Sequence, residues 1–165
     1  VMCSRGSIIP LFIDQIKAGK PLTITNSKMT RFMITLEDGV RLVWHAFDDM
    51  FGGEIYVKKI PSMSVVDIAD VIAPKAKHKI IGIRPGEKLH EQMIGIEDTP
   101  YTYEYKDHYK ILPAINDWFN DKSRIKNGKK VSSNFIYCSD NNSEWMNVED
   151  LKTWIDNNIH KIGSF

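Results

Sequence analysis

The sequence has 165 residues, of which 42% are hydrophobic and 26% are charged, and its formal net charge is +1. This length favours one domain with one hydrophobic core and is too short for a cofactor domain joined to a substrate domain. The near-neutral charge gives no electrostatic basis for nucleic-acid binding, and the longest apolar run, residues 8–13 with Pro10 inside it, is far shorter than a membrane span.

Two helices are predicted in the first 50 residues. Ser7 can cap a helix whose apolar residues continue to residue 16 and which ends near Gly19. Thr35, with Asp38 three residues later, is a capping-box variant at the start of a second helix, in which apolar residues recur at helical spacing up to Met50. A short β-like run at residues 22–25 lies between them.

A strand, a helix and a strand are predicted over residues 54–83. Residues 54–57 have the pattern of a buried strand, Ser64 and Asp67 begin a helix that ends before Pro74, and residues 79–83 form the next strand. Residues 84–91 therefore follow the carboxyl end of a strand, where α/β folds tend to place ligands.

The signals are weaker in the last third of the chain. Residues 101–105 alternate aromatic and polar side chains and are predicted to pair with residues 109–112, whereas residues 113–130 look irregular. Their basic run is interpreted as a solvated loop. Asn147 can cap a final helix over about 148–159. We predict a single domain, 1–165, with a core at 1–95 and a C-terminal extension at 96–165.

Two arginines and one glutamate are the candidate binding groups. Arg84 stands before a stiff Pro-Gly turn, and its guanidinium can bond phosphate oxygens bidentately. Ionised Glu87 can only accept hydrogen bonds, which suits a ribose diol. Arg31 lies beside Phe32, so two arginines can bracket one diphosphate. Taken alone, the Arg84 turn is better explained as a surface turn in which Arg84 and Glu87 form a solvated ion pair. Arg31 taken alone is better explained as an exposed side chain whose methylene groups cover apolar surface.

The cysteine and histidine pattern predicts no metal site. Cys3 and Cys138 are far apart and have no paired ligands nearby, so neither a zinc site nor a disulfide framework is indicated. This cysteine usage is consistent with a reducing compartment, and no signal-peptide pattern is present. We therefore expect a cytoplasmic protein that has no membrane segment.

Five ordered segments together resemble one family: residues 4–12, 29–32, 53–57, 59–63 and 81–91. They are similar to the C-terminal half of the inverting UDP-N-acetylglucosamine 4,6-dehydratases, extended short-chain dehydrogenases of polysaccharide and pseudaminic-acid biosynthesis. The tail around residues 135–145 resembles the inverting branch of that family. The resemblance implies an α/β fold, the α+β substrate-binding portion of a Rossmann-type short-chain dehydrogenase.

The resemblance also implies a set of substrate-binding residues, namely Ile9, Phe12, Arg31, Arg84 and Glu87. The two arginines are expected to hold the diphosphate of UDP-N-acetylglucosamine, and the glutamate its uridine ribose. The two apolar residues are expected to contact the nucleotide sugar, with ordinary core burial as an equal alternative. Val1 is expected to lie beside an NADP cofactor.

Two motifs of the resembled family are absent from the sequence. Gly52-Gly53 is an isolated pair rather than a glycine-rich dinucleotide turn, and no tyrosine has a lysine four residues on. No catalytic residue is therefore assigned. Cys3 stands where the family has a glycine next to the cofactor, which argues against close NADP contact.

These absences lead to expectations about how the chain works. We expect a truncated or split gene product that is inactive alone, forms homo-oligomers and works with a separately encoded cofactor-binding half. That half is expected to cover the apolar residues 8–13 and 55–57. A stand-alone UDP-sugar-binding module and a non-functional gene fragment remain as alternatives.

Overall fold

Residues 1–4, 6–115 and 117–158 are described in the computed structural model of the chain. Its helices are α1 (Ile8–Lys17), α2 (Leu36–Asp49), α3 (Val65–Ile72), α4 (Lys122–Ile125) and α5 (Val148–Asn158), with 3-10 turns η1 (Ile96–Tyr101) and η2 (Trp118–Asn120). Its strands are β1 (Leu22–Ile24), β2 (Thr30–Phe32), β3 (Ile55–Lys58), β4 (Ser62–Ser64), β5 (His78–Ile80), β6 (Gln92–Ile94), β7 (Thr102–Glu104), β8 (His108–Ile111), β9 (Lys129–Lys130) and β10 (Tyr137–Cys138). This mixture of helices and strands confirms the predicted α/β class.

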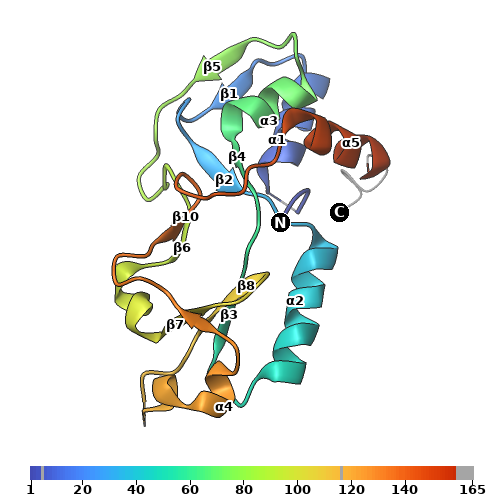
Figure 1. Cartoon of the computed structure of the whole chain (residues 1–165). Coiled ribbons are helices and arrows are strands. Elements are labelled where there is room, and N and C mark those ends of the chain that lie inside the picture. The colour runs from blue at the N-terminus through green and yellow to red at the C-terminus, as the bar shows by residue number, and fades with distance from the viewer. Residues whose placement is uncertain (5, 116, 159–165) are drawn as a thin grey trace.

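The upper part of the molecule is built from helices around a short parallel strand pair (Figure 1). β1 pairs with β5 in parallel, with Leu22 opposite His78 and Ile24 opposite Ile80. Helices α1, α3 and α5 pack beside this pair and share one hydrophobic cluster, in which Phe12, Leu22, Ile68 and Leu151 are fully buried. Their buried apolar surface holds these short elements in place.

The lower part is an antiparallel sheet of strand order β3-β8-β7-β9. The predicted pairing of residues 101–105 with 109–112 is confirmed, because Thr102 lies opposite Ile111 and Glu104 opposite Tyr109. A second cluster forms around Tyr109 and Tyr137, whose ring centroids are 5.1 Å apart. The sheet thus has its own apolar centre.

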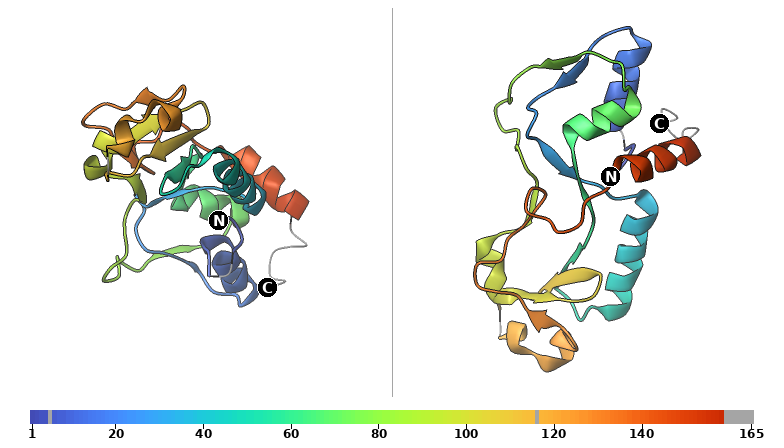
Figure 2. Two further views of the ribbon diagram at one scale, coloured as in Figure 1. Left: turned by 90° about the horizontal axis from the view of Figure 1, so that it is seen from below. Right: turned by 45° about the horizontal axis from the view of Figure 1, so that its top comes forward.

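Two further strand pairs lie between these parts. β2 pairs with β4, and β10 pairs with β6, both antiparallel. The C-terminal third begins in the lower sheet and returns upward through β10, and its last helix, α5, then packs against α3 (Figure 2). The division of the chain at residue 95 stays a prediction.

The helix starts follow the predicted caps. Thr35 Oγ1 accepts a hydrogen bond from the Asp38 amide at 3.0 Å, and Asn147 Oδ1 accepts one from the Asp150 amide at 2.7 Å. Each bond satisfies an amide that the helix itself leaves unpaired. Ser7 begins α1 as predicted, but its side chain forms no cap bond.

Some expectations are wrong in detail. The strand at residues 54–57 was predicted to be buried, but β3 is an edge strand and Ile55 is 58% exposed. Residues 113–130 are not uniformly irregular, since they contain η2, α4 and β9. The basic run is not a fully solvated loop either, because Arg124 within it is buried and paired with Glu54. Residue 159, the predicted end of the last helix, lies outside the described residues.

Candidate functional site

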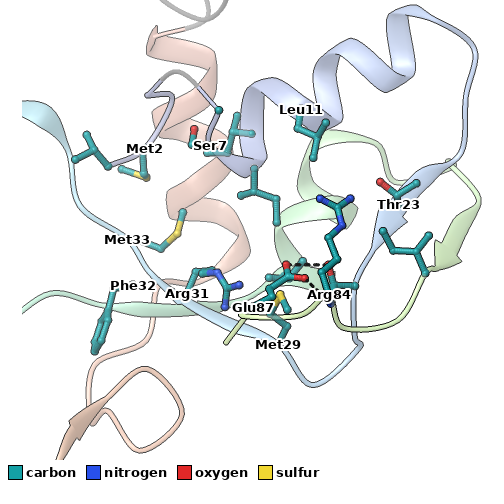
Figure 3. Close-up of a pocket in the computed structure, with 17 residues that line it drawn as sticks. Met2, Ser7, Leu11, Thr23, Met29, Arg31, Phe32, Met33, Arg84 and Glu87 are labelled. Atoms are coloured by element: carbon teal, nitrogen blue, oxygen red, sulfur yellow. Dashed lines mark hydrogen bonds between the residues drawn. The ribbon is translucent and has the colours of Figure 1, made fainter. Parts of the chain in front are cut away.

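A pocket of about 370 Å³ opens between the start of α1, strands β1 and β2, and the segment 81–87 (Figure 3). Its volume lies within the range of small-molecule sites. Its walls combine apolar side chains with two arginines, one glutamate and several hydroxyls. The lining residues are Val1, Met2, Gly6, Ser7, Ile8, Ile9, Leu11, Thr23, Thr25, Met29, Arg31, Phe32, Met33, Val65, Ile81, Arg84 and Glu87.

A tight turn positions Arg84 and Glu87. The Glu87 amide donates to the Arg84 carbonyl at 3.0 Å, and the Arg84 amide donates to Glu87 Oε2 at 3.2 Å. Pro85 and Gly86 are the central residues of this turn, and Gly86 has φ +81°, a conformation that favours glycine in a type II turn. The Pro-Gly dipeptide therefore fixes the spacing of the two charged residues.

The parallel strand pair brings a second segment to this turn. Thr25 follows β1 and Arg84 follows β5, so both leave the carboxyl ends of paired parallel strands. Thr25 Oγ1 donates to Glu87 Oε1 at 3.1 Å. Glu87 is thus held by the hydroxyl of one segment and the amide of the other, and its acceptor face is pre-oriented.

Arg31 reaches the pocket from β2 and is held by the protein itself. Its Nη1 donates to the carbonyls of Thr30 at 2.7 Å and Leu89 at 3.2 Å, and its Nε lies 3.5 Å from Glu91 Oε1. A guanidinium carries five N–H donors. Arg31 therefore keeps donor capacity for an anion while its position stays fixed.

Arg84 is the more exposed of the two arginines. Figure 3 shows its side chain rising toward α1 and Leu11, whereas the side chain of Arg31 extends toward Glu87. Two cations and one carboxylate thus meet in one pocket. An anionic group between the arginines would gain charge-assisted hydrogen bonds.

The start of α1 adds neutral donors to the same pocket. Ser7 Oγ is buried and has no hydrogen-bond partner among the described residues. Beyond it, the first amides of a helix have no partner within the helix and attract anions. The pocket can therefore offer hydroxyl and amide donors opposite the arginines.

The structure brings most of the predicted residues together. Val1, Ile9, Arg31, Arg84 and Glu87 all line the pocket. Phe12 does not, because its side chain points into the hydrophobic core and is fully buried there. The binding roles of these residues stay predictions.

Sequence reasoning did not single out Thr25 or the free hydroxyl of Ser7 as parts of the site. The available signal for Thr25 was its place at the end of a strand pattern, matching that of Arg84. Nothing in the sequence indicated that the Ser7 side chain would leave its amide uncapped.

Neither Cys3 nor the pair Gly52-Gly53 lines the pocket. Gly52 and Gly53 lie between α2 and β3, away from the pocket wall. Cys3 is buried with φ +58°, and burial raises the pKa of its thiol to about 11. No group of three or more histidine, cysteine, aspartate or glutamate residues that could hold a metal occurs within residues 1–4, 6–115 and 117–158.

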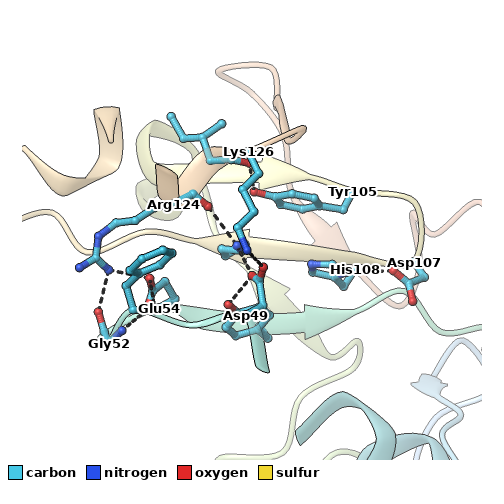
Figure 4. Close-up of polar contacts among 12 residues, drawn as sticks. Asp49, Gly52, Glu54, Tyr105, Asp107, His108, Arg124 and Lys126 are labelled. Carbon is cyan, nitrogen blue, oxygen red and sulfur yellow. Dashed lines mark hydrogen bonds and ion pairs between the residues drawn. The ribbon is translucent and has the colours of Figure 1, made fainter. Parts of the chain in front are cut away.

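A buried polar network lies in the lower part of the molecule (Figure 4). Asp49, at the end of α2, accepts hydrogen bonds from Lys110, from Lys126 at 2.5 Å and from Tyr56 at 2.7 Å. Burial raises the pKa of the Asp49 carboxyl, but these bonds outweigh burial and hold its pKa well below the usual range. We interpret the network as structural because Lys110 is 1% exposed and its ammonium donates to Asp49 and to the Arg124 carbonyl.

The chain matches known proteins along most of its length. The family model described as "Polysaccharide biosynthesis protein" matches residues 1–113, so the chain belongs to that family. It is 48% identical over 158 residues to the inverting UDP-N-acetylglucosamine 4,6-dehydratase of Campylobacter jejuni, covering 92% of this chain and 47% of the relative. It is 40% identical over 156 residues to a UDP-glucose 4-epimerase of Rickettsia canadensis, covering 92% of this chain and 46% of the relative.

A solved structure supports the same relationship. The X-ray structure of Pen from Bacillus thuringiensis matches with a TM-score of 0.78 and 31% sequence identity, covering 95% of this chain and 46% of that one. The chain therefore spans about half the length of the relatives that it matches. The resemblance to the dehydratases deduced from the sequence is confirmed.

The helices carry no sign of a membrane crossing. Within the part of the chain that the structure describes, none combines the length and the apolar character that a span requires.

Proposed function

We propose that this chain binds the UDP moiety of UDP-N-acetylglucosamine and acts as the nucleotide-sugar-binding half of an inverting 4,6-dehydratase. The observation that carries the proposal is the convergence of Arg31, Arg84 and Glu87 on one pocket. Two relatives from Campylobacter jejuni, 48% and 46% identical, are named as inverting dehydratases of this sugar nucleotide.

Each part of UDP has a partner of suitable chemistry in the pocket. The diphosphate carries negative charge, which suits the two guanidinium groups that line the pocket. The ribose hydroxyls are donors, and Glu87 offers carboxylate oxygens that are already oriented by Thr25 and the Arg84 amide. Ser7 Oγ has no hydrogen-bond partner among the described residues, so a sugar or phosphate oxygen that reached it would supply one.

The rest of the reaction is assigned outside this chain. The redox chemistry of the proposed reaction belongs to NADP, and Val1, which lines the pocket, is the residue proposed to lie beside it. We propose that the chain is inactive alone, works in the cytoplasm in surface polysaccharide or pseudaminic-acid synthesis, and forms homo-oligomers. A separately supplied cofactor-binding half is its proposed partner.

Titration calorimetry with UDP tests the binding proposal. Arg31→Ala and Arg84→Ala should each weaken binding by about 1.5–3 kcal/mol, the value of a hydrogen bond to a charged group. Lys88→Ala is the matched control, because this exposed cation follows the same turn but does not line the pocket. Absence of UDP binding by the unmodified chain, or equal loss in the control, would refute the proposal.

A further inference from the structure

Helix α2 carries an exposed apolar surface. Five apolar residues of this helix, Leu36, Val40, Val43, Trp44 and Phe47, are each between 46% and 65% exposed. At 100° per residue they fall within an arc of about 100°, so they form one continuous stripe. We call these five residues the α2 stripe.

The rest of the helix accentuates this arrangement. No residue of α2 is buried. The half-buried positions lie on a different side of the helix from the stripe, and they are Asp38, Gly39, Leu42, Ala46 and Asp49. The larger apolar face of α2 is therefore the one that the described residues leave uncovered.

The exposed area is large for a surface without a partner. Trp44 and Phe47 are 65% and 63% exposed, and an aromatic side chain carries about 150–250 Å², so these two leave roughly 200–300 Å² in water. With three aliphatic residues added, the stripe reaches the roughly 300–600 Å² of the largest patch on a typical monomer, which is often functional.

The charges around the stripe favour a protein partner over a membrane. Helices that lie on anionic membranes are rich in lysine and arginine. Outside the Asp49 network, α2 instead carries three acidic residues and one arginine, namely Glu37, Asp38, Asp48 and Arg41. A folded partner with an apolar face bordered by basic residues fits this surface.

The position of the stripe identifies the partner. The Met2 amide donates to the Ile34 carbonyl at 2.8 Å, so the start of the chain lies beside the start of α2, as Figure 1 shows. Val1 also lines the pocket. A domain seated on α2 would therefore reach the pocket edge at Val1.

The relatives contain a region that can provide such a domain. This chain covers only 46–47% of their length, so they have about as much sequence again outside the match. A second copy of this chain would cover α2 without adding the cofactor site that the proposed function requires. We therefore infer that the α2 stripe is the docking surface for the half of the dehydratase that this chain does not match, an inference that rests on the proposed function.

Co-expression tests the inference. The tagged full chain is produced together with the unmatched N-terminal half of the Campylobacter jejuni dehydratase, and the pair is analysed by size exclusion. We expect co-elution, and we expect it to be lost in the double variant Trp44→Glu/Phe47→Glu. Arg41→Glu is the matched control, because this residue is exposed on the same helix outside the stripe, and it should retain the complex.

A fusion provides a second measurement that does not depend on the solubility of the separate half. The same half is joined to Val1, and a cysteine at position 43 (Val43→Cys) is labelled with a maleimide. Its labelling should be roughly tenfold or more slower in the fusion than in the chain alone. Lys152→Cys on α5 should be labelled equally in both.

The outcomes separate this inference from the proposed function. A complex that survives the double variant, equal labelling at position 43, or a stripe occupied only by a second copy of this chain would overturn the docking surface. UDP binding by the Trp44→Glu/Phe47→Glu variant should remain unchanged, because neither residue lines the pocket. Absence of UDP binding by the unmodified chain would instead count against the proposed function.

Discussion

His108 illustrates how one buried residue makes stability depend on pH. It is 5% exposed, and its Nε2 has no partner among the described residues. Burial lowers the pKa of His108, and His45 and Lys110 lower it further, whereas Asp107 opposes the shift. Its ring also stacks on Tyr105 at a centroid distance of 4.6 Å.

The direction of this shift predicts a loss of stability in mild acid. The unfolded histidine has a pKa of about 6.5. Stability from the neutral imidazole is therefore fully present above that pH and is lost as the pH falls toward the lower folded pKa. Between these two values the unfolded chain binds a proton that the folded chain does not.

His108→Phe should remove this pH dependence. The ring stack on Tyr105 is kept, and removal of the unpaired Nε2 should offset the lost hydrogen bond between Nδ1 and Asp107, so the free energy of unfolding at pH 7.5 should change by less than about 1 kcal/mol. Thermal unfolding at pH 7.5 and 5.5 measures both effects. The same drop in melting temperature in variant and parent would show that other groups cause the acid sensitivity.

At the scale of elements, a single carboxylate joins α2 to the lower sheet. Asp49 ends the helix and bonds Tyr56 of β3 and Lys110 of β8. No residue of α2 is fully buried, and the His45 ring adds contacts with Tyr56 and His108 to this carboxylate link. The helix is thus anchored at its end while its stripe stays exposed.

Asp49→Ala should destabilise the chain strongly. Removing one partner of a buried ion pair costs about 3–5 kcal/mol, because Lys110 would be left as an uncompensated buried charge. Urea unfolding measures the loss, and Lys110→Met in the same chain should restore part of it. Lys126→Met is the control, and it should cost less than about 1 kcal/mol since Lys126 is half exposed. Equal effects of Asp49→Ala and Lys126→Met would contradict this account.

At the scale of the whole molecule, the pocket belongs to one of two hydrophobic centres. The cluster around Phe12 and Leu151 supports the pocket, whereas the cluster around Tyr109 and Tyr137 supports the lower sheet. Short strand pairs connect the two parts. A ligand in the pocket should therefore stabilise the upper part of the molecule more than the lower sheet.

Hydrogen exchange in the presence of UDP tests this unevenness. At about 100 times the dissociation constant, binding contributes roughly 2.7 kcal/mol to the bound state. Protection should increase at the turn 84–87, around residue 31 and at the start of α1, with little change in β7 and β8. Equal protection throughout the chain would show that the two parts unfold as one unit.

The sequence predicted several features that depend on local chemistry. Neighbouring residues determine the caps of α2 and α5, the Pro-Gly turn after Arg84 and the hairpin of β7 and β8. All of these features could therefore be predicted from the sequence. The family resemblance could also be recognised, since ordered motifs are themselves a property of sequence. Five of the six residues proposed for the site line one pocket.

What the sequence could not supply were the contacts between distant segments. Only the structure shows that Arg124 of the basic run pairs with Glu54, 70 positions away in the sequence. Thr25 likewise reaches the site only because β1 pairs in parallel with β5. Likewise, helical spacing predicted the apolar residues of α2, but spacing cannot tell whether such a face is covered. Local propensity depends on neighbours in the chain, whereas burial and the assembly of a pocket depend on which remote surfaces meet, and only the tertiary structure decides that.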